Sequence, residues 1–94
     1  MKHISELTAE EFKELEDYVS LSLQGHLAHL ENPIYPKTEE GKSWANAWLA
    51  KCNSFTGKIY GRELGDYIEA RLETSTQEYL SKLKKLEQEV ADHE

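Results

Sequence analysis

The stretch that decides the fold is NPIYPKTEEGKSWANAWLAKC, residues 32–52, which turns the chain between two helix-patterned segments. It holds both prolines, both tryptophans and the single cysteine of the 94-residue chain. Pro33 lacks a backbone N–H and disfavours helical geometry in the residue before it, so a preceding helix has to end near Asn32. Thr38 is a suitable N-cap for the next helix, with two glutamates in its first turn. The stretch therefore predicts a rigid turn followed by a helix.

The segment before this turn has the pattern of one amphipathic helix. Thr8 with Glu11 three residues later is typical of a capping box, which marks a helix start. Apolar residues then recur at steps of three or four and form one stripe: Phe12, Leu15, Val19, Leu23, Leu27 and Leu30. These observations predict a helix over about residues 9–30.

The chain after the turn predicts two further helices. The first, at about residues 39–53, carries Trp44 and Trp48 on one face and ends before Gly57. The second spans about residues 62–91 and has its own apolar stripe, which passes in phase through the polar cluster around Ser75. One long helix is therefore favoured, and two helices hinged near Ser75 are the alternative. Residues 55–60, FTGKIY, find no pairing partner in the pattern, so no sheet is expected.

The predicted fold is all-α, a single domain over residues 1–94. Its first two helices form an antiparallel hairpin, and the third packs along both. A core this small often depends on oligomerisation, and residues 79–90 keep coiled-coil spacing, so we expect a homodimer through the C-terminal helix. The predicted core consists of Leu15, Val19, Leu23, Leu27, Tyr35, Trp44, Trp48, Leu64, Ile68 and Leu72.

Composition limits the partners of the chain as a whole. Its net charge of −7 disfavours direct binding to nucleic acid or to anionic membrane surfaces, which depends on cationic groups. We find no apolar run typical of a signal peptide or of a membrane span, and one cysteine cannot form an internal disulfide. The chain is therefore expected to be soluble and cytoplasmic.

The charge is distributed unevenly, and two hypotheses follow from its layout. Residues 1–31 and 63–94 each carry a net charge of −5, whereas residues 32–62 carry +3. Carboxylates on a rigid helix can occupy sites built for phosphates, although a solvated helix face would have the same pattern. The candidate partner-binding residues on these acidic faces are Glu10, Glu14, Asp17, Asp66, Glu69 and Glu73.

The basic centre supports the alternative hypothesis, an RNA-binding surface. In it, cationic side chains would contact phosphates and aromatic residues would stack on bases. However, the two tryptophans are also the largest apolar side chains, which a small helical core needs. The candidate RNA-binding residues are Lys37, Lys42, Lys51, Lys58 and Arg62.

Catalytic and metal-binding patterns are weak. His26 and His29 lie one helical turn apart and could share a metal with Cys52, but the spacing supplies no fourth ligand. Cys52 has no neighbouring His–Asp pattern, and no glycine-rich phosphate loop is present. We therefore expect no cofactor, no metal and no enzymatic activity.

The residues Asn32, Pro33, Tyr35, Trp44 and Trp48 resemble the central motif of the ribosome modulation factor family and of its short phage and bacterial relatives. In that motif a proline–tyrosine turn is followed by two tryptophans four residues apart on a helix. The resemblance covers residues 20–52 and implies a helical hairpin there. Family members that bind ribosomes are basic, whereas this chain is acidic.

Together these patterns predict a small acidic, non-enzymatic binding protein, encoded by a phage or a bacterium. It is expected to dock onto a larger host protein or nucleoprotein complex and to modulate or inhibit it. The alternative function is a ribosome- or RNA-associated modulator that uses residues 35–62.

Overall fold

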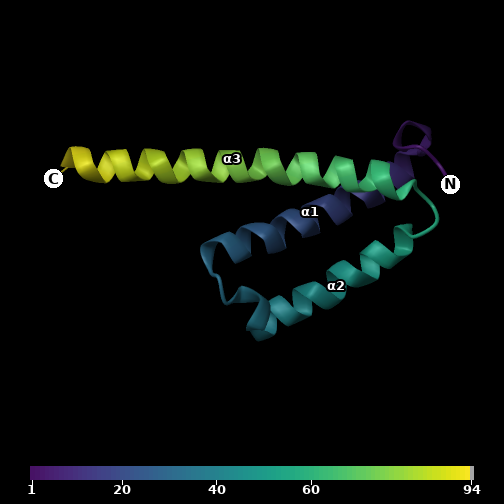
Figure 1. The fold of residues 1–94 in the computed structure, drawn as a ribbon, viewed down its shortest axis with the longest axis horizontal. Helices are drawn as coiled ribbons and strands as arrows, with labels where there is room; N and C mark the ends of the chain where they lie inside the picture. Colours follow the sequence, from purple (N-terminus) through teal and green to yellow (C-terminus); the bar gives the residue numbers. More distant parts are fainter. Residues whose placement is uncertain (94) are drawn as a thin grey trace.

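Three α-helices make up most of the computed structural model, which describes residues 1–93 and the side-chain surroundings of residues 1–90 (Figure 1). They are α1 (Ala9–Glu31), α2 (Glu39–Phe55) and α3 (Gly61–His93), with short 3-10 helices η1 (Ile4–Glu6) and η2 (Tyr35–Lys37) before α1 and α2. The predicted all-α class with three helices is confirmed. The predicted helix bounds each lie within two residues of these, and α3 continues through Ser75 without a hinge.

Side-chain caps fix where the first two helices begin. The Thr8 hydroxyl accepts a hydrogen bond from the Glu11 N–H at 3.1 Å, and the Glu11 carboxylate accepts one from the Thr8 N–H at 3.0 Å. This backbone bond, aided by the Lys2 ammonium, lowers the pKa of Glu11 to about 2. The Thr38 hydroxyl accepts from the Gly41 N–H in the same way. After α2, Gly57 adopts a φ of +82°, a turn conformation that suits glycine.

The long helix α3 packs on α1 and not along both hairpin helices, which corrects the predicted arrangement. Tyr67 and Arg71 of α3 both donate hydrogen bonds to the Glu16 carboxylate of α1, at 2.7 and 3.0 Å. Further along, His26 of α1 meets Thr76 of α3, so the two helices run in the same direction. Figure 1 shows α2 diverging from α3, and the end of α3 extending past the hairpin. The molecule is therefore elongated, at 57 × 31 × 21 Å.

The tightest part of the core lies where the start of α1 meets the end of α2. Of the predicted core residues, only Leu15 and Val19 are buried, and the other eight are partly buried. Their buried neighbours are Tyr18, Phe55 and Ile59, which the sequence pattern does not place in the core. The rings of Tyr18 and Phe55 lie 5.6 Å apart and join α1 to α2.

The N-terminal residues close this end of the core. Lys2 forms an isolated parallel β-bridge with Ile59. The Lys2 N–H donates to the Lys58 carbonyl, and the Tyr60 N–H donates to the Lys2 carbonyl. The segment 55–60 thus has a pairing partner after all, and that partner is the distant N-terminus. The His3 ring forms an ion pair with Glu63 and packs on the Tyr60 ring at 4.6 Å.

The His3–Glu63 contact predicts a pH dependence of stability. The hydrogen bond to Glu63 is the main cause that raises the pKa of His3 above its usual value of 6.5. A raised folded-state pKa stabilises the protein fully below pH 6.5, and this stabilisation is lost as the pH rises through the raised value. We expect His3→Gln to destabilise the protein more at the lower pH than at the higher, in thermal unfolding followed at successive pH values, because the ring contact with Tyr60 is lost at every pH but the ion pair only at the lower. Glu63→Gln should have the same effect, and the double variant should add nothing. A loss of the same size at every pH would contradict the ion pair with Glu63.

Candidate functional site

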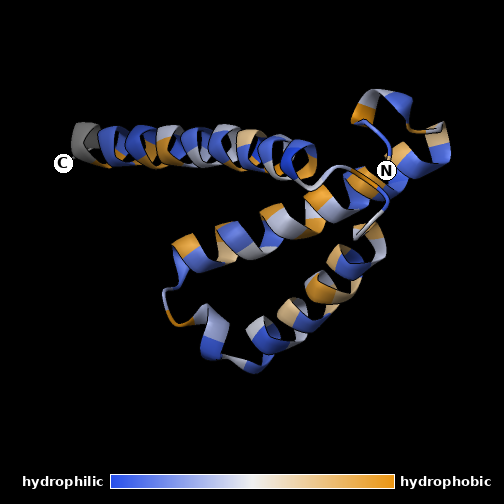
Figure 2. Ribbon diagram, turned by 45° about the vertical axis from the view of Figure 1, so that its right-hand side comes forward, coloured by the Kyte–Doolittle hydropathy of each residue, from blue (hydrophilic) through white to orange (hydrophobic). Residues whose placement is uncertain are grey.

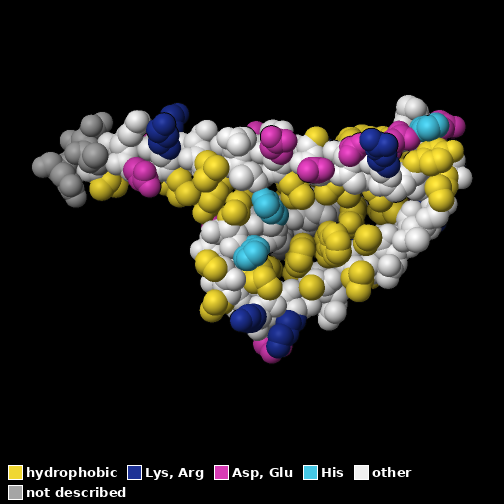
Figure 3. Space-filling model, in the orientation of Figure 1, with side chains coloured by type: hydrophobic (Ala, Val, Ile, Leu, Met, Phe, Trp, Pro, Cys, Tyr) yellow, Lys and Arg dark blue, Asp and Glu magenta, His cyan; other side chains and the backbone are white. Residues whose placement is uncertain are grey.

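An apolar cleft of about 300 Å³ opens between the three helices. Figure 3 shows it as a hollow walled by hydrophobic side chains, with two histidines at its edge. The cleft is lined by Ser22, Gly25, His26 and His29 of α1, by Tyr35 and Pro36 of the turn, by Gly41, Trp44, Ala45 and Trp48 of α2, and by Ile68 and Leu72 of α3. We call it the tryptophan cleft.

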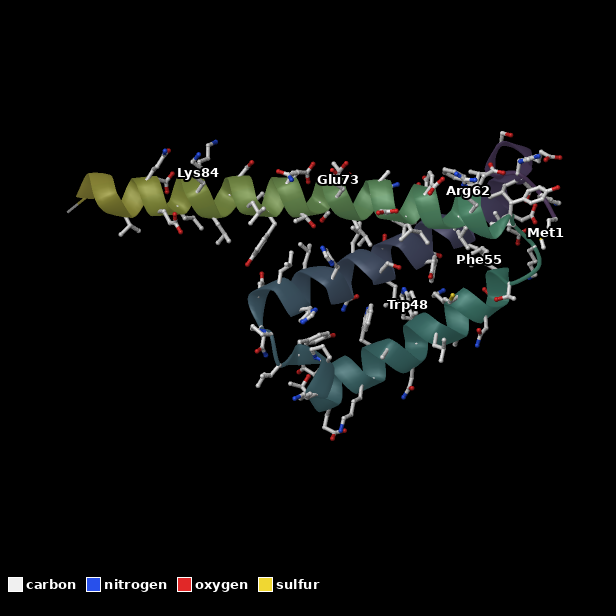
Figure 4. All side chains as sticks on the ribbon, viewed as in Figure 1. Met1, Trp48, Phe55, Arg62, Glu73 and Lys84 are labelled. Atoms are coloured by element: carbon white, nitrogen blue, oxygen red, sulfur yellow. The ribbon has the colours of Figure 1, made fainter. Side chains whose placement is uncertain are left out.

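Both tryptophans are held in place by hydrogen bonds to α1. The indole N–H of Trp44 donates to the Leu21 carbonyl at 2.7 Å, and that of Trp48 donates to the Ser22 hydroxyl at 2.8 Å. Their rings stack with centroids 6.0 Å apart, and Figure 4 shows Trp48 projecting between α1 and α2. Each ring is only partly buried, so one side packs on the hairpin while the other lines the cleft. The tryptophans therefore serve the core and the cleft together.

The histidine wall of the cleft is tied to α3. The Thr76 hydroxyl has one hydrogen, which it donates to the Leu72 carbonyl at 2.8 Å. His26 Nε2 lies 2.7 Å from the Thr76 hydroxyl oxygen. Because the only hydroxyl hydrogen is already used, the imidazole donates this second hydrogen bond, so its proton is on Nε2. This contact bridges α1 and α3 beside the cleft. Because its walls are hydrogen-bonded to one another, the cleft is preorganised, which lowers the entropic cost of binding.

The six candidate acidic residues are all exposed, and within residues 1–90 none of them forms an ion pair. They do not form one surface. Glu10 and Glu14 of α1 line one pocket with Lys58, and Glu14 lines a second pocket with Lys51. The three on α3, Asp66, Glu69 and Glu73, are neighbours in sequence of Ile68 and Leu72, the α3 residues that line the cleft, but do not line it themselves.

The five candidate basic residues are exposed too, as RNA binding requires, but the structure does not gather them. Lys37 and Lys42 lie at the turn end of α2. Lys51 lies about 14 Å further along the helix, from the 1.5 Å rise per residue. Lys58 and Arg62 follow its end, and the first of these lies beside the carboxylates of α1.

Neither a metal nor a membrane-spanning function gains support from the described part of the chain. Within it, no three His, Cys, Asp or Glu side chains are grouped so that they could hold a metal. His26 is hydrogen-bonded to Thr76 of α3. Cys52 lies near Tyr18, and burial together with this thiol raises the pKa of the Tyr18 hydroxyl. Along residues 1–93 no helix has the length and apolar character needed to cross a membrane.

The fold and the site define an all-α, three-helix protein with a preorganised aromatic cleft. No protein-family model matches the chain, and neither a curated protein nor a solved structure matches it. The resemblance to the ribosome modulation factor family thus rests on the motif residues themselves. Three of these, Tyr35, Trp44 and Trp48, line the same cleft.

Sequence reasoning did not connect the small residues of α1, Ser22 and Gly25, with a cleft. On α1 the residues Leu15, Tyr18, Ser22, Gly25 and His29 recur at steps of three and four, as a second stripe beside the apolar one. Two small residues in such a stripe indicate where a bulky neighbour approaches closely. Gly25 has this function, because the Trp44 ring lies where its side chain would be.

Proposed function

We propose that this chain is a small, non-enzymatic binding protein, which docks onto a larger protein or nucleoprotein complex. The tryptophan cleft receives an apolar or aromatic side chain from a basic segment of that partner. The observation that carries this proposal is the cleft itself, an apolar site of about 300 Å³ that is open to solvent and has hydrogen-bonded aromatic walls. Buried aromatic anchors in preformed pockets dominate the affinity of many protein interfaces.

The charge of the chain supports a basic partner. The net charge is −7, and the candidate carboxylates of α1 and α3 are exposed and without ion-pair partners among residues 1–90. Figure 3 shows acidic side chains along α3 above the cleft. Opposite charge around an interface speeds association and excludes wrong partners. The acidic faces would therefore steer a basic segment toward the cleft, which then selects its apolar side chain.

Tryptophan fluorescence tests this proposal, because both tryptophans of the chain line the cleft. We expect a lysine- and arginine-rich peptide with one central leucine or phenylalanine as its anchor to shift the emission in a saturable manner. The same peptide with serine at the anchor position, and an acidic peptide with the anchor kept, should bind at least tenfold more weakly. Equal responses to the anchor and serine peptides would overturn the proposal.

A variant that fills the cleft supplies the matched test on the protein. Ala45 lines the cleft, whereas Ala50 lies on the same helix in a separate shallow depression. We expect Ala45→Leu to weaken anchor-peptide binding about tenfold or more, and Ala50→Leu to leave it unchanged; tenfold corresponds to about 1.4 kcal/mol. If a short RNA binds instead, and Lys37→Glu and Lys42→Glu abolish that binding, the RNA-associated alternative is the correct one.

A further inference from the structure

The wall of the tryptophan cleft contains a hydrogen-bond acceptor that the protein itself does not use. The Ser22 hydroxyl and the indole N–H groups of Trp44 and Trp48 all form hydrogen bonds within the hairpin. On His26, by contrast, only Nε2 is used, as the donor to Thr76. Its other ring nitrogen, Nδ1, then carries a lone pair, and among residues 1–90 no group donates to it.

This Nδ1 atom can be reached by a ligand. In the described part of the chain no side-chain nitrogen or oxygen is both buried and without a hydrogen bond, so Nδ1 has to be accessible to solvent. The His26 side chain lines the cleft and is partly buried. The second histidine of the wall, His29, is exposed, so water can hydrate both of its nitrogens. His26 therefore offers a ligand an acceptor and no donor, because its one N–H is used on Thr76.

Helix α1 already accepts two indole N–H groups close to this position. Trp44 donates to the Leu21 carbonyl, and Trp48 donates to the Ser22 hydroxyl. His26 lies four residues after Ser22, one turn further along the same face of the helix. Figure 2 shows hydrophobic residues recurring along both α1 and α2, the helices that carry most of the cleft walls. The face thus has an acceptor for a third indole, and a chain with two tryptophans cannot supply it.

We propose that the anchor side chain of the partner is a tryptophan, whose indole N–H donates to His26 Nδ1 in the tryptophan cleft. This inference rests on the proposed function and names the side chain that the cleft selects. The basic character of the surrounding segment follows from charge complementarity with a chain of net charge −7. His26 is then a specificity-determining residue of the binding site.

Hydrogen-bonding capacity separates tryptophan from the other possible anchors. The indole N–H only donates and His26 Nδ1 only accepts, so their contact leaves neither polar atom unpaired. A tyrosine hydroxyl also donates, but it adds an oxygen acceptor for which His26 has no remaining N–H. Leucine and phenylalanine would cover Nδ1 without donating to it, and a covered polar atom without a partner weakens binding.

The shape of the cleft suits a flat ring. The rings of Trp44 and Trp48 are stacked with an angle of 25° between their planes, and Ala45 beside them adds only a methyl group to the wall. Further aromatic rings pack well on such faces, in offset or edge-to-face contact. The volume of about 300 Å³ lies at the lower end of the range for ligand sites, so it accommodates one large side chain.

Isothermal titration calorimetry of the full chain with matched peptides tests this inference. The peptides share one lysine- and arginine-rich sequence, with either tryptophan or 3-benzothienylalanine at the centre. In 3-benzothienylalanine sulfur replaces the indole N–H, so the ring shape is kept and the donor is lost. We expect the tryptophan peptide to bind about tenfold more tightly, which is the effect of one hydrogen bond.

The possible outcomes separate this inference from the proposed function. If the two peptides bind equally, and both bind more tightly than the peptide with serine at the centre, the tryptophan anchor is wrong and the proposed function stands. If neither binds more tightly than the serine peptide, both are wrong.

Variants of the cleft wall identify the acceptor. His26→Phe keeps a flat ring but removes Nδ1, so the tryptophan and 3-benzothienylalanine peptides should bind it with equal affinity. This variant also loses the contact with Thr76, and Thr76→Val is therefore its control, since it loses the same contact but keeps the imidazole. In Thr76→Val the tenfold ratio should remain, whatever the affinity itself. In His29→Phe the ratio should remain as well. Loss of the ratio in His29→Phe, or its persistence in a His26→Phe protein that is helical by circular dichroism, would overturn the assignment to His26.

Nitrogen-15 NMR of the imidazole rings supplies a measurement that needs no variant. We expect the free protein to show His26 Nδ1 without a proton. The tryptophan peptide should shift this resonance, because Nδ1 then accepts a hydrogen bond, and the 3-benzothienylalanine peptide should shift it much less. Equal shifts with the two peptides, or a proton on Nδ1 in the free neutral ring, would contradict the proposal.

Discussion

Replacing Gly25 by alanine is expected to lower the free energy of unfolding by about 2 kcal/mol, because the added methyl group overpacks the hairpin. An ideal Cβ at this position would lie 2.0 Å from the Trp44 ring. The ring cannot retreat freely, since its N–H donates to the Leu21 carbonyl one turn away on the same helix as Gly25. The methyl group therefore breaks this hydrogen bond or forces α2 away from α1. Either change alters the wall of the tryptophan cleft.

Gly65→Ala is the matched control for this substitution. Gly65 lies inside α3, and a Cβ there would meet nothing within 4 Å. Alanine is favoured over glycine in a helix by about 1 kcal/mol, so this variant should be more stable than the wild type. Urea unfolding followed by tryptophan emission measures both variants. A Gly25→Ala protein that is as stable as the wild type and has an unchanged emission spectrum would contradict the close packing of Trp44 on α1.

The helices could be predicted because the information that determines them is local. The Thr8–Glu11 box and the Thr38 cap act within one turn, and Pro33 acts on the residue before it. The phase of the stripe through Ser75 is enough to favour a single long α3. Each of these signals involves only a few neighbouring residues, so it can be recognised directly in the amino-acid sequence.

The core and the site depend on contacts between distant residues, which periodicity alone does not contain. A stripe predicts which face of α1 is buried but not how deeply, so it groups Leu27 with Leu15 although only Leu15 is fully buried. The β-bridge of Lys2 with Ile59 joins residues 57 positions apart in the chain. The surface charges show the same effect, because folding brings Lys58 beside Glu10 and Glu14. Net charges by segment therefore overstate how far acidic and basic surfaces are separated.

The cleft could be predicted only in part, unlike the helices, which were predictable, and the core contacts, which were not. The sequence pattern identifies its tryptophans as one pair on one face, but it does not decide whether they belong to the core or to a contact surface. In the structure they belong to both the core and the contact surface. Because α3 packs on α1, it leaves Trp44 and Trp48 of α2 partly exposed. A third helix packed along the whole hairpin would have closed the cleft. The opening is thus a consequence of the direction of α3, which the pattern of residues 32–52 does not predict.

Phe55→Ala is expected to destabilise the protein more than Gly25→Ala does, with a loss of about 3–5 kcal/mol in the free energy of unfolding. By its sequence position Phe55 belongs with the aromatic residues of the candidate RNA surface. In the structure it is only 5% exposed, at the last residue of α2, where its ring packs on Tyr18. Its removal leaves a cavity between α1 and the segment that leads to α3. For a chain of this length the melting temperature should fall by roughly 15 °C or more.

Leu49→Ala is the control that separates the two interpretations of Phe55. Leu49 lies on the same helix but is 52% exposed, so its truncation should cost less than about 1 kcal/mol. Thermal unfolding of both variants measures the difference. A Phe55→Ala protein that melts like Leu49→Ala, but binds a single-stranded RNA more weakly than the wild type, would make Phe55 a contact residue. A loss of several kcal/mol places its function in the packing of α2 on α1, the two helices that carry most of the walls of the tryptophan cleft.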